Sequence, residues 1–390
     1  MRQPLGVPAS LLRIGQCYYV QPANLQRLRS FTSDQNTLAS VIEGNLPVWP
    51  ALDVGSGALR RASRDWHDVA VLTTRSPWAI ACQLLTRGTD AILVGGNDRT
   101  SLAAYAERAA RSETVVGIGS GLVMDAAKYV AKQNGQHLLQ VPTTASNNAC
   151  FTRTAWIMEA GVRTPERECP IPRAIIVDRE LLATAPVPLN RAGIAEILCS
   201  HTALFDWRLA YEAGRPVDWD ESLEEATRCE LEALETLAPQ VATGDVLAFE
   251  EIIQACARFA PWFSSHPHAR FNAGSEHIFA WGLEAVAGIR LVHGETVALG
   301  IILMSLLQGN APEWAASVIR AANVSFHPED IGVTWTTVEE TLRSLPRRAQ
   351  MLPWYTVIDT LGSPEQAADR LARLGSEGRS YVDEVKRRST

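Results

Sequence analysis

The sequence lacks an excess of basic residues. It has 36 Lys and Arg against 43 Asp and Glu, which gives a formal net charge of -7. Proteins that bind nucleic acids usually present a basic surface that neutralises phosphates. Arginines do cluster in the short C-terminal stretch "VKRRST", but such a tail is more often a solvated helix end. This charge balance excludes nucleic acid as the expected partner and leaves a small molecule as the expected ligand.

Long apolar runs and paired cysteines are also missing. The longest apolar stretch, 297–307, is shorter than the ~20 residues that a membrane span needs, and prolines interrupt the N-terminal segment where a signal peptide would lie. The seven cysteines are scattered and never form a Cys-x-x-Cys pair, which excludes a disulfide framework and a cysteine-based zinc site. We expect a cytoplasmic protein without a membrane partner, and a homo-oligomer (dimer or larger).

A chain of 390 residues is long enough for two domains. Residues 1–65 show no clean periodicity, and we interpret them as an N-terminal appendage of unknown role. Residues 66–185 contain short, β-branched-rich runs that are typical of strands buried on both faces of a parallel sheet. These runs are "DVAVLTT" (68–74), "DAILVGG" (90–96), "ETVVGIG" (113–119), "QHLLQVP" (136–142) and "RAIIVD" (173–178).

Helix-length segments at 77–87, 101–111 and 122–133 separate the first four runs. This alternation predicts an α/β domain with a doubly wound parallel sheet, whose ligand binds at the carboxyl ends of the strands. From residue 186 helical patterns replace strands, for example at 221–237 and 246–259. We therefore predict an all-α C-terminal domain over 186–390, with a ligand site in the cleft between the two domains.

A glycine-rich turn lies between a predicted strand and helix in "VVGIGSGLVMDAAKYVAK" (115–132). Gly119, Ser120 and Gly121 place backbone N–H groups at a helix N-terminus, where they can hold a diphosphate. Asp125 and Lys128 follow on the first helical turns. The turn taken alone fits a tight strand-to-helix connection equally well.

A polar segment, "VPTTASNN" (141–148), follows the next strand at the same edge of the sheet. The hydroxyls of Thr143, Thr144 and Ser146 suit a nicotinamide amide or a ribose, and Asn148 suits a substrate. The alternative is a polar loop that only caps the following segment.

Three candidate metal ligands come from three predicted helices: Glu196 in 190–210, His277 in "GSEHIFAWGLE", and His293 in "HGETVALG". Three protein ligands and one open position are the arrangement of a catalytic zinc site. Spacing alone does not make this set unique, because three other histidines compete with it: His201, His266 and His268.

These motifs, in this order, resemble the superfamily of iron-containing alcohol dehydrogenases, glycerol dehydrogenases, sn-glycerol-1-phosphate dehydrogenases and dehydroquinate synthases. The resemblance covers about residues 68–362 and includes "GSGLVMDAAK", "VPTTASNN", "GIAEILCSHTALFDWRLA" with its Asp-Trp pair, the two histidine motifs, and "WYTVID" (354–359). The last segment is similar to the glycerol-1-phosphate dehydrogenase branch. The resemblance implies a Rossmann-like domain joined to a helical domain, the dehydroquinate synthase-like fold.

By this resemblance, Glu196, His277 and His293 are the metal and catalytic residues, and Asn148 touches the substrate. The implied cofactor residues are Gly119, Ser120, Gly121, Asp125, Thr143, Thr144 and Ser146. The implied activity is a metal-dependent, NAD(P)-linked dehydrogenase of a small polyol, polyol phosphate or related secondary alcohol or ketone.

The chain departs from the family pattern at several positions. The first ligand is Glu196, as in dehydroquinate synthases, where glycerol and glycerol-1-phosphate dehydrogenases have Asp. Ser200 stands where iron-type relatives add a histidine, so we expect Zn²⁺ rather than Fe²⁺ or Ni²⁺. Asn148 replaces an Asp, and Leu122 replaces the Ser or Thr of the glycine loop.

Arg75 follows the first strand, and no acidic residue stands there, so we expect a preference for NADP over NAD. Two alternatives stay open. One is a sugar-phosphate cyclase of the dehydroquinate synthase type, although the lysine-rich substrate stretch expected after "VPTT" is replaced by "NNACFTRTAWIM". The other is a catalytically inactive binding protein on the same fold.

Overall fold

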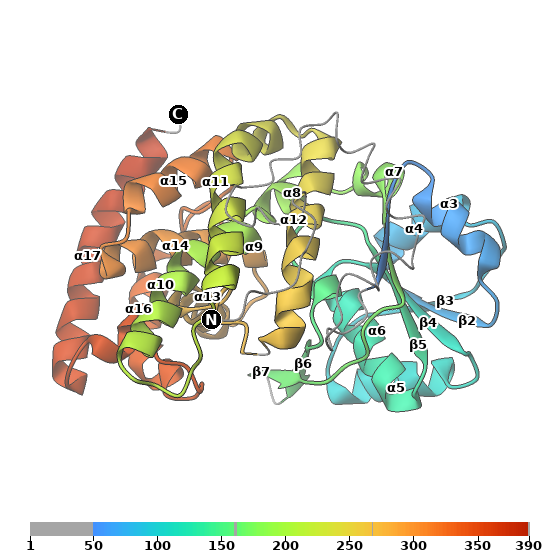
Figure 1. The fold of residues 1–390 in the computed structure, drawn as a ribbon, viewed down its shortest axis with the longest axis horizontal. Helices are drawn as coiled ribbons and strands as arrows, with labels where there is room; N and C mark the ends of the chain where they lie inside the picture. The colour runs from blue at the N-terminus through green and yellow to red at the C-terminus, as the bar shows by residue number, and fades with distance from the viewer. Residues whose placement is uncertain (1–49, 160–161, 267, 389–390) are drawn as a thin grey trace, which may run out of the picture.

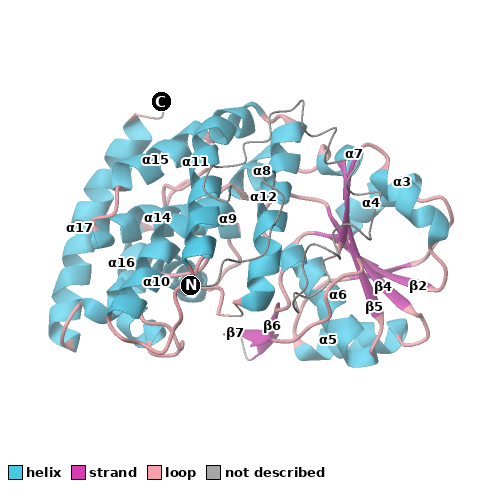
Figure 2. Cartoon of the chain, in the orientation of Figure 1, coloured by secondary structure: helices cyan, strands magenta, loops and turns pink. Residues whose placement is uncertain are grey.

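A computed structural model describes residues 50–159, 162–266 and 268–388. The chain folds into a sheet-containing half and a helical half, which lie side by side along the longest axis of the molecule (Figure 1). Figure 2 shows the strands gathered in the first half and the helices that fill the second. This arrangement agrees with the α/β domain followed by a helical region that the sequence predicts.

The sheet has six strands in the order β1-β8-β5-β4-β2-β3, and all neighbouring strands are parallel. The five predicted runs form its strands β2 to β5 and β8. The strand bounds are β1 Ala51–Gly55, β2 Val69–Thr73, β3 Ala91–Leu93, β4 Thr114–Gly119, β5 His137–Pro142 and β8 Ala174–Asp178.

Helices cover both faces of this sheet. On β4, Val115 packs into the core shared with α5 and α6, while its neighbour Val116 packs into the core on the opposite face with α3 and α4. Because both faces are buried, the strands are continuous apolar runs rather than alternating ones. The helix bounds in this half are α3 Ala58–Ala62, α4 Arg75–Leu84, α5 Arg99–Ala109, α6 Gly121–Asn134 and α7 Arg179–Leu182.

Residues 51–65 are part of the sheet half rather than of an appendage. Strand β1 pairs with β8 along its whole length, and Leu59 in α3 is fully buried. The sequence pattern missed this strand because "ALDVG" is short and half-exposed at the edge of the sheet. Residues 1–49 of the predicted appendage lie outside the described residues.

The second half consists of packed helices. Two of them begin at an aspartate whose side chain accepts backbone N–H groups: Asp220 for α11 and Asp245 for α12. None of the helices among the described residues has the length and apolar character that a membrane span requires. The helix bounds are α8 Val187–Ala192, α9 Ala195–Leu198, α10 Ser200–Glu212, α11 Glu221–Thr243, α12 Val246–Ser265, α13 Ser275–Ala287, α14 His293–Gln308, α15 Pro312–Ala321, α16 Trp335–Ala349 and α17 Pro364–Arg387.

The single helix expected over 190–210 is divided into α8, α9 and α10. At the break after α8, a Cβ on Gly193 would lie 1.7 Å from the carbonyl oxygen of Ala145. The chain therefore needs glycine where the helical half touches the loop after β5. This close contact is a tertiary feature that the helical pattern does not reveal.

An antiparallel hairpin, β6 Ala155–Glu159 and β7 Val162–Glu166, reaches from the sheet half toward the helices. Trp156 packs against Trp281 of α13, with 5.1 Å between the ring centroids. Arg163 lies 3.5 Å from the carboxylate of Glu284 on the same helix. The hairpin thus joins the two halves beside the predicted metal ligand His277.

Candidate active site

The first part of the site is the edge of the sheet where β4 and β5 end. Gly119 pairs with Pro142 at this edge, and the N–H of Thr143 donates to the carbonyl of Gly119 (2.9 Å). Helix α6 begins here with Ser120 as its N-cap, but no side chain caps its first N–H groups. By contrast, the side chain of Asp98 caps the neighbouring α5. An uncapped helix N-terminus offers N–H donors and a positive dipole end, which suit a diphosphate.

Close packing also requires glycine at two positions of this turn. A Cβ on Gly119 would lie 2.6 Å from a methyl group of Val123, and one on Gly121 would lie 3.0 Å from the amide nitrogen of Asn147. The turn is therefore a tight strand-to-helix connection, and it leaves the N–H groups at the start of α6 uncapped. Its role as a tight connection is compatible with diphosphate binding.

Asp125 and Lys128 form an ion pair of 2.9 Å on the next turns of α6. Lys128 is fully buried, and its ammonium donates to the carbonyls of Ala149 (3.0 Å) and Thr154. The pair ties α6 to the segment that follows the polar loop. This role is structural, and contact of Asp125 with a cofactor stays a prediction.

The polar loop 143–148 crosses the N-terminus of α6. Thr144 and Ser146 share a hydrogen bond of 2.8 Å between their hydroxyls, and Thr143 and Thr144 are buried. The N–H of Ala145 donates to the side chain of Asn190 (2.9 Å), which fixes the loop to the helical half. The loop is thus a linker between the two parts of the site.

Arg75 is the first residue of α4 and is exposed. Strand β2, which precedes it, pairs with β4 up to Thr73 and Ile118. Arg75 therefore lies at the same edge of the sheet as the uncapped N-terminus of α6.

The second part of the site is a cluster of Glu196 from α9, His277 from α13 and His293 at the start of α14. One potential ligand atom from each residue lies within 4.8 Å of the other two. The Nε2 atom of His293 is 3.2 Å from the Oε1 atom of Glu196, and the two imidazole centroids are 5.3 Å apart. Three helices thus bring together one carboxylate and two imidazoles, the donor set of a divalent transition metal.

A further observation, the environment of the Glu196 carboxylate, supports metal binding by this cluster. The Oε1 atom of Glu196 is buried and accepts no hydrogen bond of good geometry, even though the Nε2 atom of His293 lies 3.2 Å away, whereas buried carboxylate oxygens are normally paired. Burial acts to raise the pKa of Glu196, but His293, His277 and the backbone N–H of Asn148 hold that pKa below its ordinary value. The surroundings of Glu196 therefore favour its ionised form, which is the form that binds cations.

The competing histidines lie elsewhere. The Nε2 atom of His201 is 2.7 Å from the carbonyl oxygen of Asn310, and the rings of His266 and His268 pack around Trp207. Within the described ranges, the groups of three potential metal ligands include none of these histidines. The structure thus separates candidates that spacing alone left equal.

A second group of potential ligands comprises Cys199, Glu276 and His277. Its atoms already have hydrogen-bond partners, because the thiol of Cys199 donates to backbone carbonyls and both carboxylate oxygens of Glu276 accept donors. Burial raises the pKa of the Cys199 thiol well above its ordinary value, which disfavours the thiolate that binds metals. The Glu196 cluster is the better metal site.

Asn272 connects the two parts of the site, and the sequence analysis missed it. Its side-chain oxygen accepts from the amide of Asn148 (2.9 Å), and its own amide donates to the carbonyl of Glu196 (2.8 Å). Asn148 is thereby held beside the metal cluster. Asn272 precedes the "GSEH" motif by only two residues, but nothing in its spacing indicates this bridge.

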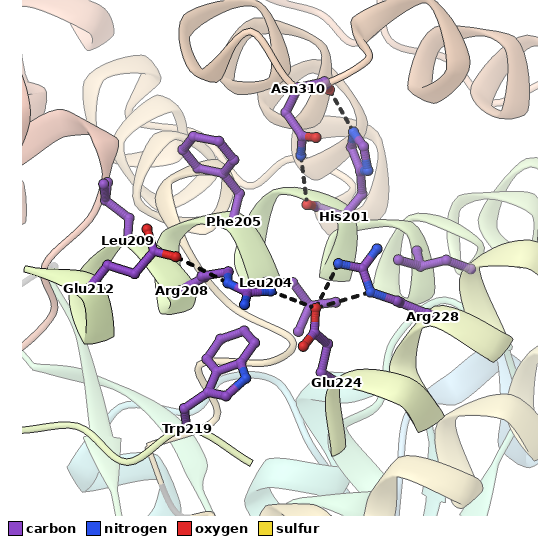
Figure 3. A pocket seen from close by; sticks show the side chains of 11 residues that line it. His201, Leu204, Phe205, Arg208, Leu209, Glu212, Trp219, Glu224, Arg228 and Asn310 are labelled. Atoms are coloured by element: carbon purple, nitrogen blue, oxygen red, sulfur yellow. Dashed lines mark hydrogen bonds and ion pairs between the residues drawn. The ribbon is translucent and has the colours of Figure 1, made fainter. Parts of the chain in front are cut away.

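A separate cavity of about 280 Å³ lies between α10 and α11, and His201 and Asn310 contribute to its wall (Figure 3). Its two arginines, Arg208 and Arg228, both pair with Glu224. Its lining shares no residue with the Glu196 cluster, and its charges neutralise one another. The cluster and the sheet edge are therefore better candidates for the active site than this cavity.

Comparison with known proteins supports the resemblance. A family model described as iron-containing alcohol dehydrogenase matches residues 70–186. The glycerol-1-phosphate dehydrogenase [NAD(P)+] of Hyperthermus butylicus is 31% identical over 268 residues, which cover 67% of this chain and 73% of the relative. That of Aeropyrum pernix is 28% identical over 264 residues, covering 67% of this chain and 74% of the relative.

Solved structures agree on the fold. Glycerol dehydrogenase from Schizosaccharomyces pombe superimposes with a TM-score of 0.69 at 20% identity, covering 88% of this chain and 94% of that chain. A probable glycerol dehydrogenase from Sinorhizobium meliloti 1021 gives 0.68 at 22% identity, covering 85% and 98%. The shared fold and a relationship that spans both halves show that this chain belongs to the iron-containing alcohol dehydrogenase family.

Proposed function

We propose that this chain is a metal-dependent, NAD(P)-linked dehydrogenase that acts on a small polyol phosphate or a related secondary alcohol, or reduces the matching ketone. The observation that carries the proposal is the cluster of Glu196, His277 and the half-buried His293, joined through Asn272 and Asn148 to the open N-terminus of α6. Its relatives named glycerol-1-phosphate dehydrogenase make glycerol 1-phosphate the first substrate to test.

Each group of residues has a separate role in binding the cofactor or the substrate. The backbone of Gly119, Ser120 and Gly121, at the start of α6, holds the cofactor diphosphate. Thr143, Thr144 and Ser146 orient the nicotinamide or its ribose from the loop that crosses this helix. Asn148, fixed by Asn272, binds a substrate hydroxyl or carbonyl beside the cluster.

Glu196, His277 and His293 hold one divalent metal, for which we favour Zn²⁺. Zinc suits one carboxylate and two imidazoles, and Ser200 occupies the place of the additional histidine of iron-type relatives. A divalent metal held by these three residues would supply Lewis-acid chemistry at the substrate oxygen, and a nicotinamide bound at the sheet edge would supply hydride transfer. The cytoplasmic location and the homo-oligomeric state expected from the sequence stay predictions.

The stoichiometry of cofactor use tests this function. Purified protein with added Zn²⁺ is assayed on polyols, polyol phosphates and their ketones, with NAD(P) or NAD(P)H followed by absorbance. We expect one cofactor converted for each substrate converted, because a dehydrogenase releases the cofactor in its changed redox state.

The main alternative is a sugar-phosphate cyclase, and the glutamate at position 196 favours it, since dehydroquinate synthases also use Glu there. A cyclase returns the hydride to its substrate within one turnover, so catalytic cofactor is sufficient. Product in many-fold excess over cofactor, without net oxidation or reduction of the cofactor, would replace the dehydrogenase proposal with the cyclase. Cofactor and metal binding without turnover of any substrate in either assay would favour an inactive binding protein.

We also propose a preference for NADP(H), based on the exposed Arg75 at the cofactor edge of the sheet. Replacement Arg75→Ala is expected to weaken NADP(H) binding roughly tenfold and leave NAD(H) binding unchanged, because only NADP(H) carries a 2′-phosphate for the arginine to bind. Titration with both cofactors measures this, with Arg111→Ala, an exposed arginine before β4, as the control. Tighter binding of NAD(H) that is insensitive to Arg75→Ala would contradict the preference.

A further inference from the structure

A second buried glutamate stands next to the proposed ligand His277. Glu276 is fully buried in the first turn of α13, and its Oε1 atom lies 2.8 Å from the Nδ1 atom of His277. Glu196 belongs to the same cluster as His277, but its surroundings differ from those of Glu276. The Oε1 atom of Glu196 accepts no hydrogen bond of good geometry, whereas both oxygens of Glu276 accept one.

The partners of Glu276 determine where the proton of His277 lies. The same Oε1 atom accepts the N–H of Gly274 at 2.7 Å, so this oxygen presents lone pairs rather than a proton. The Nδ1 atom of His277 must then carry the hydrogen and donate it. A neutral imidazole has one donor nitrogen and one acceptor nitrogen, which leaves Nε2 with its lone pair free for a metal.

The orientation of Glu276 is itself fixed by the surrounding helices. The hydroxyl of Thr202, on α10, donates to its Oε2 atom at 2.7 Å. A Cβ on Gly274 would lie 3.0 Å from Oε2, so the glycine before α13 leaves room for the carboxylate. The positive end of the α13 dipole stabilises the negative charge. Glu276 is thus held rigidly from two elements before any metal binds.

We propose that Glu276 is a positioning residue that sets the tautomer, direction and basicity of His277 and thereby the metal affinity of the Glu196 cluster. It acts through the imidazole and touches neither the substrate nor the cofactor. The inference rests on the proposed function only in that His277 is a metal ligand. Carboxylates that accept from the second nitrogen of a ligating histidine raise metal affinity by about 10- to 100-fold.

The test measures Zn²⁺ affinity of the metal-free full chain by competition with a chromophoric chelator, so it needs no activity assay. We expect Glu276→Ala to bind Zn²⁺ about 10- to 100-fold more weakly than the wild type. Glu276→Gln is expected to lose roughly three- to tenfold, because its amide oxygen still accepts from Nδ1 but the charge that makes the ring a stronger ligand is gone.

Asp206→Asn provides the matched control. Asp206 is a buried carboxylate at the N-terminus of the same helix, where it accepts the N–H of Ser275, and no imidazole contact involves it in the described structure. A structural role of Glu276 predicts equal losses of Zn²⁺ affinity in Glu276→Ala and Asp206→Asn, and such equality overturns the inference. If Glu276→Ala does not fold, Glu276→Gln decides: wild-type Zn²⁺ affinity in that variant also overturns it.

His277→Ala separates this inference from the proposed function. If His277→Ala loses the metal and Glu276→Ala keeps wild-type affinity, the positioning role is wrong and the metal site stands. If His277→Ala itself keeps the metal, the proposed metal site is wrong, whatever Glu276 does.

Discussion

The two parts of the active site are built in different ways. At the sheet edge, Gly119 to Gly121 and Thr143 to Ser146 lie where two adjacent strands end, so neighbouring segments of sequence supply most of the proposed cofactor contacts. The metal cluster instead combines Glu196 with two histidines about 80 and 97 residues away, from three separate helices. The first surface depends on local backbone geometry, and the second depends on the packing of the helical half.

This difference predicts that single substitutions affect the two parts unequally. The proposed diphosphate contacts at the sheet edge are backbone N–H groups, which most side-chain substitutions leave in place. Each proposed metal ligand, by contrast, is a single side chain. The metal cluster should therefore show the largest mutational effects.

The largest effect is expected for Glu196→Gln. The neutral amide removes the negative charge from the cluster, and the loss of several kcal/mol of metal-dependent stabilisation corresponds to a fall of about 10³-fold in kcat/KM. Steady-state kinetics on the best substrate of the panel, with Zn²⁺ in excess, measures it. The conservative change Ser146→Ala at the sheet edge should lower kcat/KM much less. An equal loss of kcat/KM in both variants would show that the two parts of the site are equally sensitive to substitution.

A smaller effect, on stability, is expected where the two parts touch. In Gly193→Ala, the new Cβ would lie 1.7 Å from the carbonyl oxygen of Ala145, so the loop after β5 must move away from α9. We expect the free energy of unfolding to fall by about 3 kcal/mol, as for other severe steric substitutions. Denaturant unfolding measures this fall, with Gly88→Ala as the control because its Cβ would meet no atom within 4 Å. A stability equal to that of the control would show that the contact between loop and helix is easily rearranged.

The smallest expected effect is a pH dependence of the free energy of unfolding that comes from the titration of Asp206. Burial raises the pKa of Asp206 to about 6, although the N–H groups of Ser275 and Val357 that it accepts act to lower it. Because this pKa is above the unfolded value near 4, protonation of Asp206 stabilises the fold below about pH 4, and this contribution is lost as the pH rises to about 6.

The Asp206→Asn variant should lack that titration. The difference in free energy of unfolding between wild type and variant is expected to change by about 2 kcal/mol between pH 4 and pH 6.5, in the direction of relatively lower wild-type stability at the higher pH. Denaturant unfolding at a series of pH values measures it. A constant difference over this range would show that Asp206 does not titrate there.

The sheet edge could be predicted from sequence, whereas most of the metal site's surroundings could not. The apolar runs of the sequence and their composition predicted β2 to β5 and the glycine turn, because strands buried on both faces are apolar throughout. The short, half-exposed β1 carries no such pattern. In the helical half the three ligand candidates came from residue type together with family motifs.

The partners of those ligands are set by tertiary packing. Asn272 reaches Asn148 and Glu196, whose sequence positions are 124 and 76 residues away, and only the fold brings them together. The exclusion of His201, His266 and His268 has the same origin, since each pairs with a neighbour that spacing does not reveal. Glu276 was visible beside His277 in the sequence, but its role depends on Gly274 and Thr202 holding it in place.

Metal analysis of His277→Ala beside His201→Ala tests the central claim most directly, because it compares a histidine inside the cluster with one outside it. We expect one divalent metal per chain in the wild type and in His201→Ala, and almost none in His277→Ala, since loss of one of three ligands abolishes tight binding. Full metal content in His277→Ala, or its loss in His201→Ala with the fold intact, would contradict the assignment of Glu196, His277 and His293 as the metal site.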